Sequence, residues 1–289
     1  MLEINVLSPR KGSNPGGSCS FRAGNRLVSG YFKYCHTNKI RKSALRVEHQ
    51  PIYEQVTLQL ARDIGLKTID SYVLSNLDRS VKFKGWKGRE KQDTDPNNRD
   101  FYFLSVYIPK SVVIAEKEYR KAGETTVILD SRDDMTKIAR VFQREDVYLR
   151  TLLVSDVVGK RQNYVFNPHR GVDGEIVYLD LGCSFVKAVG GDMLLPRGLK
   201  KCGSREVRRM KKKLRGVQLI SAKNDNFVDL ESLSEQIPDL KIPMLNPRRN
   251  VPLQDLLTSS EMEEVEGYVL QGIVENLPRL KKRDLICKL

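Results

Sequence analysis

Two short stretches decide the fold: GYFK at residues 30–33 and YEQVTLQLARDIGL at residues 53–66. The first lies within residues 26–35, where aromatic and β-branched residues gather, and this composition predicts a strand. The second follows Pro51 and ends at Gly65, and its apolar residues recur every four positions. Proline at the start, glycine just past the end and this spacing together predict an amphipathic helix.

Strand and helix patterns are segregated along the rest of the chain. Strands are expected at residues 68–74, 101–108, 164–167 and 175–179, a long helix at about 133–158, and mostly helices from 197 to 289. Strand-rich and helix-rich halves predict an α+β fold with two lobes, because alternating βαβ units would mix the two patterns. No GxGxxG precedes a helix, which argues against a Rossmann fold.

The expected boundary between the lobes lies at residue 108. Residues 1–108 would form a small, strand-rich N-lobe, in which residues 9–24 are a Gly-rich flexible loop and residues 78–100 a charged, exposed insertion. Residues 109–289 would form a larger, helical C-lobe. It is expected to contain a hairpin at 159–185, a basic helix at 204–216 and C-terminal helices.

The charge of the chain is concentrated in one segment. Fifty Lys and Arg against 36 Asp and Glu give a net charge of +14, and residues 195–215 alone carry +9, with ten basic residues and one acid. On a helix, Val207, Met210 and Leu214 would face the core, while the basic residues would share the outer side. This side comprises Arg205, Arg208, Arg209, Lys212 and Arg215.

Two interpretations of this basic helix remain open. It is either a solvated face or a docking surface for a polyanion, such as nucleic acid, an inositol phosphate, an anionic membrane or a phosphorylated segment of the chain. Aromatic residues do not alternate with the basic ones, so stacking on single-stranded bases is not predicted.

Cysteine and histidine usage indicates the compartment and limits the chemistry. Five scattered cysteines, none in a CxxC pair, are typical of reduced thiols in a cytosol, and three histidines without ligand spacing argue against a zinc centre. We find no apolar run of 18 residues and no secretory signal pattern. The sequence therefore predicts a cytoplasmic protein, acting in its own cell or delivered to the cytosol of another.

The predicted hairpin holds residues suited to magnesium. Asn163 opens one strand, and Asp180 closes its partner in the run Asp180-Leu181-Gly182. Both supply hard oxygen ligands, which suit Mg²⁺ bound to nucleotide phosphates.

Phosphoryl transfer also needs a cation on the phosphates, an acid to hold that cation and backbone donors over the phosphate tail. Lys33 in its strand and Glu54 in its helix are candidates for the cation and the acid, with Arg46 as a rival to Lys33. The structural alternative for Lys33 is a lysine on an edge strand that extends its ammonium group to solvent. The structural alternative for Glu54 is an acid favoured in the first turn of any helix. The backbone donors would come from a short glycine and serine run, Gly16, Gly17, Ser18 and Ser20.

From GYFK, YEQVTLQLARDIGL, QNYVF and VYLDLG, the chain resembles the HipA-like kinases and, more distantly, the phosphoinositide kinases and the protein-kinase superfamily. The likeness spans about residues 16–185. It implies a two-lobed kinase fold with ATP in the cleft, adenine held by Val106 and Tyr107, and Mg²⁺ on Asn163 and Asp180.

The resemblance departs from the family at the catalytic loop. The position of the catalytic aspartate, five residues before Asn163, holds Val158, and the nearest carboxylate is Asp156, with Lys160 between. Asp156 would serve as the base if the loop were two residues longer; otherwise Lys160 supplies charge and no base exists. A HipA-like Ser/Thr protein kinase dependent on ATP and Mg²⁺ is therefore predicted first. The alternatives are a lipid kinase acting on phosphoinositides and a pseudokinase or nucleotide- or polyanion-binding module without catalysis.

Overall fold

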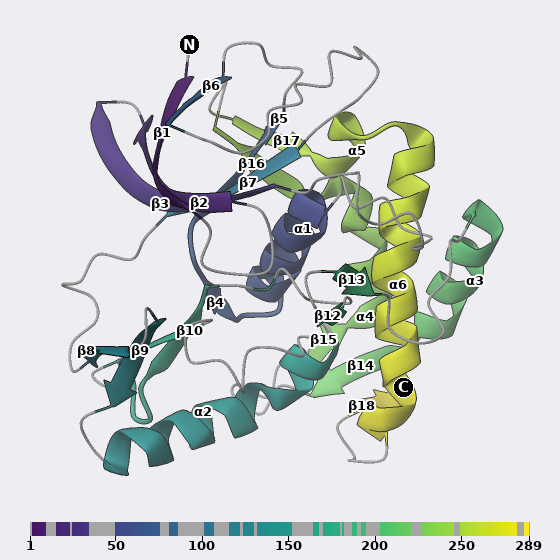
Figure 1. Cartoon of the computed structure of the whole chain (residues 1–289). Coiled ribbons are helices and arrows are strands. Elements are labelled where there is room, and N and C mark those ends of the chain that lie inside the picture. Colours follow the sequence, from purple (N-terminus) through teal and green to yellow (C-terminus); the bar gives the residue numbers. More distant parts are fainter. Residues whose placement is uncertain are drawn as a thin grey trace.

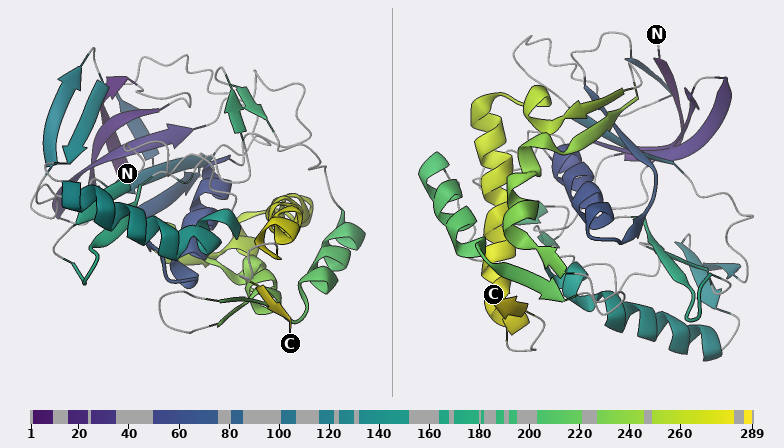
Figure 2. Two further views of the ribbon diagram at one scale, coloured as in Figure 1. Left: turned by 90° about the horizontal axis from the view of Figure 1, so that it is seen from below. Right: turned by 180° about the vertical axis from the view of Figure 1, so that it is seen from behind.

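The computed structural model shows a mixed α+β fold, drawn in Figure 1 and from two further sides in Figure 2. The structure describes residues 2–9, 16–23, 25–34, 50–75, 81–85, 101–106, 116–121, 124–129, 132–151, 164–167, 170–179, 181, 187–189, 192–194, 203–220, 227–245, 249–281 and 286–288. None of the helices in this part of the chain is both long enough and apolar enough to cross a lipid bilayer.

The largest element is an eight-stranded sheet in the order β17-β16-β5-β7-β3-β2-β1-β6. Its neighbours pair antiparallel, except that β1 pairs with β6 and β5 with β16 in parallel. The strands are β1 (Leu2–Pro9), β2 (Gly16–Ala23), β3 (Arg26–Tyr34), β5 (Ser71–Ser75), β6 (Val81–Lys84), β7 (Phe101–Val106), β16 (Lys241–Met244) and β17 (Arg249–Pro252).

The two faces of the sheet belong to two separate apolar clusters. Successive side chains of a strand alternate between faces, so Phe32 and Leu104 pack in one cluster with Ile4 and Cys19. Phe103, next to Leu104 along β7, belongs to the other and larger cluster. The larger cluster lies on the side of the sheet where α1 packs.

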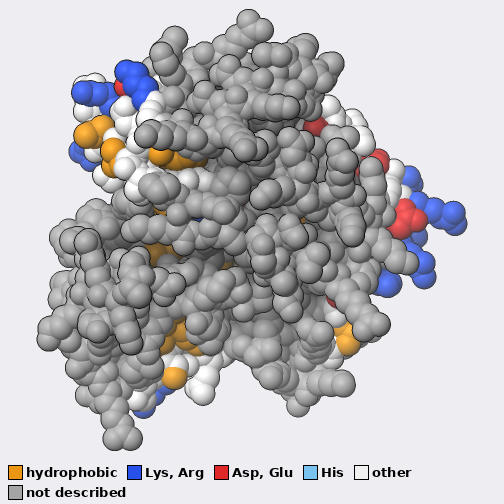
Figure 3. Space-filling model, viewed as in Figure 1, with side chains coloured by type: hydrophobic (Ala, Val, Ile, Leu, Met, Phe, Trp, Pro, Cys, Tyr) orange, Lys and Arg blue, Asp and Glu red, His pale blue; other side chains and the backbone are white. Residues whose placement is uncertain are grey.

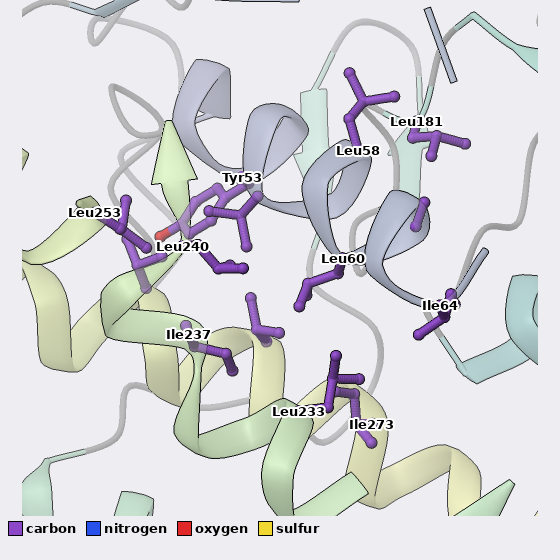
Figure 4. Close-up of a cluster of buried hydrophobic side chains, with 14 of the residues drawn as sticks. Tyr53, Leu58, Leu60, Ile64, Leu181, Leu233, Ile237, Leu240, Leu253 and Ile273 are labelled. Atoms are coloured by element: carbon purple, nitrogen blue, oxygen red, sulfur yellow. The ribbon is translucent and has the colours of Figure 1, made fainter. Parts of the chain in front are cut away.

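Helix α1 (Gln50–Asp63) lies between the sheet and the helices of the second half, and eleven of its 14 residues are buried. Figure 4 shows the side of α1 that faces away from the sheet: Leu60 and Ile64 point toward Leu233 and Ile273. The rings of Tyr53 on α1 and Tyr268 lie 4.6 Å apart. One continuous core therefore joins the sheet, α1 and the carboxyl-terminal helices.

A second, smaller sheet has three strands in the order β10-β11-β4. Strands β10 (Tyr164–Asn167) and β11 (Glu175–Tyr178) form a hairpin, and β4 (Lys67–Thr68) pairs in parallel with β11. Helix α2 (Arg132–Thr151) packs on this hairpin through Phe142, whose ring lies 5.1 Å from that of Tyr164.

The remaining elements form hairpins and helices around this core. They are β8 (Glu116–Lys121), β9 (Glu124–Leu129), β12 (Lys187–Val189), β13 (Asp192–Leu194), α3 (Ser204–Leu214), β14 (Val217–Ile220), β15 (Phe227–Asp229), α4 (Leu230–Glu235), the 3-10 helix η5 (Ile237–Asp239), α5 (Leu253–Leu256), α6 (Ser259–Lys281) and β18 (Ile286–Lys288).

Several elements predicted from the sequence are confirmed. Strand β3, helix α1 and the hairpin β10–β11 match the predicted positions within two residues. Gly65 follows α1 with φ +94°, the left-handed conformation that favours glycine at a helix end. The strand predicted at 68–74 is split into β4 and β5, because the chain leaves the small sheet at Ile69 and joins the large one at Ser71.

One prediction about a loop is wrong: residues 16–23, expected to be part of a flexible loop, form β2. Val81–Lys84, within the expected insertion, forms edge strand β6, and Lys84 on this strand is exposed as predicted. The described part from 197 to 289 is mostly helical, as predicted, but it also contains five strands. Two of these, β16 and β17, extend the large sheet beyond β5, although they lie on the far side of the expected boundary at residue 108.

Candidate functional site

The centre of the candidate site is an ion pair between β3 and α1. Nζ of Lys33 lies 2.7 Å from Oε1 of Glu54, and the two side chains are 13% and 1% exposed. Since α1 begins at Gln50, Glu54 lies in the second turn, and the first turn contains no acid. Favourable interaction with the helix terminus therefore does not account for Glu54. The contact matches the sequence prediction, while the binding of phosphate by Lys33 stays a prediction.

Lys33 stands in a row of paired residues that crosses three strands. Gly16 on β2 is its neighbour on one side, and Phe103 on β7 is its neighbour on the other. Nζ lies 5.7 Å from the centroid of the Phe103 ring, within the range of a cation–π contact. The ammonium group is thus held by a carboxylate and an aromatic face. An ammonium has three N–H donors, so a lysine fixed in this way is suited to binding an anion as well.

A polar row lies beside the row of Lys33. Tyr31 on β3 pairs with Ser105 on β7, and Ser105 pairs with Ser71 on β5. The Ser71 hydroxyl donates a hydrogen bond of 2.8 Å to Oε1 of Gln55, which lies next to Glu54 on α1 and is fully buried. Sequence reasoning missed these residues. Their signal was Ser71 at the start of the largely apolar strand sequence SYVLS and Ser105 within FYFLSV.

The glycines expected to cover phosphates have a structural role in the sheet. A Cβ at Gly16 would lie 2.0 Å from the carbonyl oxygen of Phe32, and a Cβ at Gly17 would lie 2.2 Å from that of Ser8. Both positions therefore require glycine for the close approach of strands. Ser18 forms a hydroxyl–hydroxyl hydrogen bond with Ser8, and Ser20 pairs with Ser29 further along β2 and β3.

The expected adenine contacts are only partly described. Val106 is the last residue of β7, and its N–H donates a 2.8 Å hydrogen bond to the carbonyl oxygen of Asp70. That donor is therefore engaged within the fold. Tyr107 lies outside the described residues.

The predicted catalytic and metal residues lie outside the described part of the chain. These are Asp156, Lys160, Asn163 and Asp180, together with Arg46, the rival of Lys33. The hairpin that leads to Asn163 and Asp180 is described, and its register pairs Tyr164 with Tyr178. Tyr164 and Tyr178 thus form one end of the hairpin, and in the sequence Asn163 directly precedes Tyr164 while Asp180 follows Tyr178 by two residues.

Two contacts join this end of the hairpin to α1 and to the segment that follows α1. Leu181, which follows Asp180, is 1% exposed and belongs to the same buried cluster as Leu58 of α1. Figure 4 shows these two leucines beside each other. The N–H of Ile69, shortly after α1, donates a 3.0 Å hydrogen bond to the carbonyl oxygen of Tyr178. Because Glu54 and Leu58 are one turn apart on α1, the ion pair and the hairpin end are held by the same helix.

The hairpin is also fixed from the side of α2. The Tyr178 hydroxyl donates a 2.5 Å hydrogen bond to Oε2 of Glu145. Burial, and to a lesser degree the nearby Glu145 carboxylate, raises the pKa of Tyr178 far above its ordinary value, so the phenol stays protonated as a donor. Arg144 reaches the turn of the hairpin, where its guanidinium lies 3.2 Å from Oδ2 of Asp173.

Comparison with known proteins gives few matches. No protein-family model matches the chain, and no curated protein matches it. Among solved structures, the chain is similar to a crystal structure of the Helicobacter pylori proinflammatory kinase CtkA. The two are 12% identical, with a TM-score of 0.37, and the match covers 98% of this chain and 81% of that one. A TM-score this low establishes neither the fold nor the activity.

Proposed function

We propose that this chain is a nucleotide-dependent phosphotransferase in which Lys33 binds the phosphates of ATP. The observation that supports the proposal is the buried ion pair of Lys33, on the third strand, with Glu54, on the helix that follows. In protein kinases a lysine on the third strand contacts the α- and β-phosphates and is held by a glutamate of the next helix. In this chain the buried carboxylate of Glu54 on α1 would hold Lys33 of β3 in the same way.

The second part of the proposed site is the end of the β10–β11 hairpin. Asn163 and Asp180 would hold Mg²⁺, which would neutralise charge on the phosphates when bound. Among the described residues no three His, Cys, Asp or Glu side chains gather at one point, and both proposed ligands lie outside them. Support for this part is therefore the connection of the hairpin to α1 through Leu181 and Leu58.

The acceptor is proposed to be a protein side chain hydroxyl, as the resemblance of the sequence to HipA-like kinases implies. A lipid acceptor is the alternative. A third candidate, nucleotide binding without transfer, is favoured by one specific observation: Val158 stands where the resemblance places the catalytic aspartate. Transfer would then use Asp156 as the base, proceed by positioning without a base, or not occur.

Binding and transfer are tested separately. Calorimetry measures the affinity for Mg-ATP, and transfer of radiolabelled phosphate is then followed to the chain itself, to a generic protein and to phosphoinositide vesicles. Lys33→Met is expected to abolish binding or transfer. The matched control is Lys67→Met, which changes an exposed lysine on β4. Unchanged binding and transfer in Lys33→Met would refute the proposal, and binding without transfer to any acceptor would support the third candidate.

A further inference from the structure

Helix α3 presents a basic surface that the proposed active site does not use. Its apolar residues Val207, Met210 and Leu214 are buried, as the sequence predicted, and α3 packs beside α6. The opposite side of the helix is exposed and basic. Figure 3 shows Lys and Arg side chains projecting from the edge of the molecule where Figure 1 places α3.

The basic residues of α3, together with Arg215 directly after it, fall into a paired and an unpaired group. Lys211 pairs with Glu266 at 2.6 Å, and Arg215 pairs with Glu231 at 3.2 Å. These pairs anchor the helix to its neighbours. The other basic residues of the helix have no acidic partner within 4.0 Å among the described residues: Arg205, Arg208, Arg209, Lys212 and Lys213.

Most of the unpaired group converges on one hollow in the surface. The hollow has a volume of about 740 Å³, and its described lining consists of Arg205, Glu206, Arg208, Arg209 and Lys212. The one acid in this lining is turned to the start of the helix, where Oε2 of Glu206 accepts a 3.2 Å hydrogen bond from the N–H of Gly203. Four cations thus line a space of the size that small-molecule ligands occupy, roughly 300–1,000 Å³.

We infer that this hollow binds a compact anion that carries several phosphate groups. Unpaired like charges repel one another, and a ligand with several phosphates would neutralise them at one place. A membrane is disfavoured because the apolar side of α3 is buried against the protein and leaves no apolar face to enter a bilayer. Duplex nucleic acid is disfavoured because its phosphates are spread over a wide surface, whereas these cations gather at one hollow.

The test uses the full chain and myo-inositol hexakisphosphate as the probe, with calorimetry at low and at physiological salt. The test variant is Arg208→Glu/Arg209→Glu/Lys212→Glu, and a milder variant replaces the same three residues by Gln. The control, Arg22→Glu/Arg26→Glu/Lys241→Glu, makes the same change of charge at exposed residues of β2, β3 and β16. Thermal unfolding checks that each variant is folded.

The probe is expected to bind the wild type, more weakly at higher salt because mobile ions screen the charges. The test variant should lose at least about 100-fold in affinity, since each charge-assisted contact is worth about tenfold or more. The control variant should stay within about threefold, and Mg-ATP affinity should be unchanged in both. Equal loss in test and control variants would overturn the inference. So would binding only to a 16-base-pair duplex, or only to phosphatidylserine vesicles, offered in the same assay.

Discussion

Lys33 and Glu54 form an ion pair across the contact between β3 and α1, with 2.7 Å between Nζ and Oε1. The two residues are 21 positions apart in the sequence and come from a strand and a helix. Glu54 is 1% exposed, and the ammonium group of Lys33 compensates its negative charge. A charge buried in this way is costly when its partner is removed, and far less costly when both are replaced by apolar residues.

This relationship predicts the stability of three variants. Lys33→Met should lower the free energy of unfolding by about 3–5 kcal/mol, because it leaves the Glu54 carboxylate buried without Lys33, and Glu54→Leu should cost less, because Lys33 is partly exposed. The double variant should lose less than the sum of the two. Urea unfolding of all three provides the measurement, and losses that simply add would show that the pair contributes no coupling energy.

Asp180→Ala should abolish phosphotransfer while leaving the protein folded, because a metal-binding carboxylate is not needed for packing. Radiolabelled transfer measures the activity, and thermal unfolding measures the fold. Asp255→Ala, which removes an exposed carboxylate of α5, is the control. Wild-type turnover in Asp180→Ala would exclude a role for Asp180 in the reaction.

Gly17→Ala and Gly30→Ala should destabilise the large sheet. A Cβ at Gly17 would lie 2.2 Å from the carbonyl oxygen of Ser8, and a Cβ at Gly30 would lie 2.2 Å from that of Ser105. Overpacking of this kind costs about 1–3 kcal/mol or more. The midpoint of thermal unfolding of each variant should fall below that of the wild type by the same amount in the presence and in the absence of Mg-ATP. If Gly17→Ala weakened nucleotide binding at unchanged stability, the glycine would serve the phosphates and not the sheet.

Cys19 should make stability depend on pH in the alkaline range. Burial raises the pKa of its thiol from an ordinary value near 9.0 to about 12. Between these two values the unfolded chain releases the proton and the folded chain keeps it, so stability falls as pH rises. The thiol contributes fully below about pH 9, and its contribution declines by up to about 1.4 kcal/mol per pH unit above it.

The measurement is urea unfolding at pH 8 and pH 10, compared between the wild type and Cys19→Ala. The difference between the two proteins isolates the thiol from the lysines and tyrosines that titrate in the same range. The wild type should lose more stability than the variant between the two pH values. Equal losses would mean that Cys19 ionises as readily in the folded protein as in the unfolded chain.

The sequence by itself determined those elements whose signal lies within one segment. Pro51 and Gly65 mark the ends of α1, and the spacing of Val207, Met210 and Leu214 predicts which side of α3 is buried. The hairpin β10–β11 was equally predictable, because its two strands are neighbours joined by a short turn. Such features depend on interactions between residues close in sequence, which a local pattern records.

Only the tertiary structure decided which distant segments meet. Strands β6 and β16 are four residues long, and each completes the large sheet by pairing with a strand remote in sequence. The composition of Gly16–Ala23 is typical of a loop, yet glycine is what the close packing of β2 requires. The sequence supplied Lys33 and Glu54 as candidates, but their ion pair exists because α1 is buried between the sheet and α6. Contacts of this kind are set by the burial of apolar surface over the whole chain, which no single segment encodes.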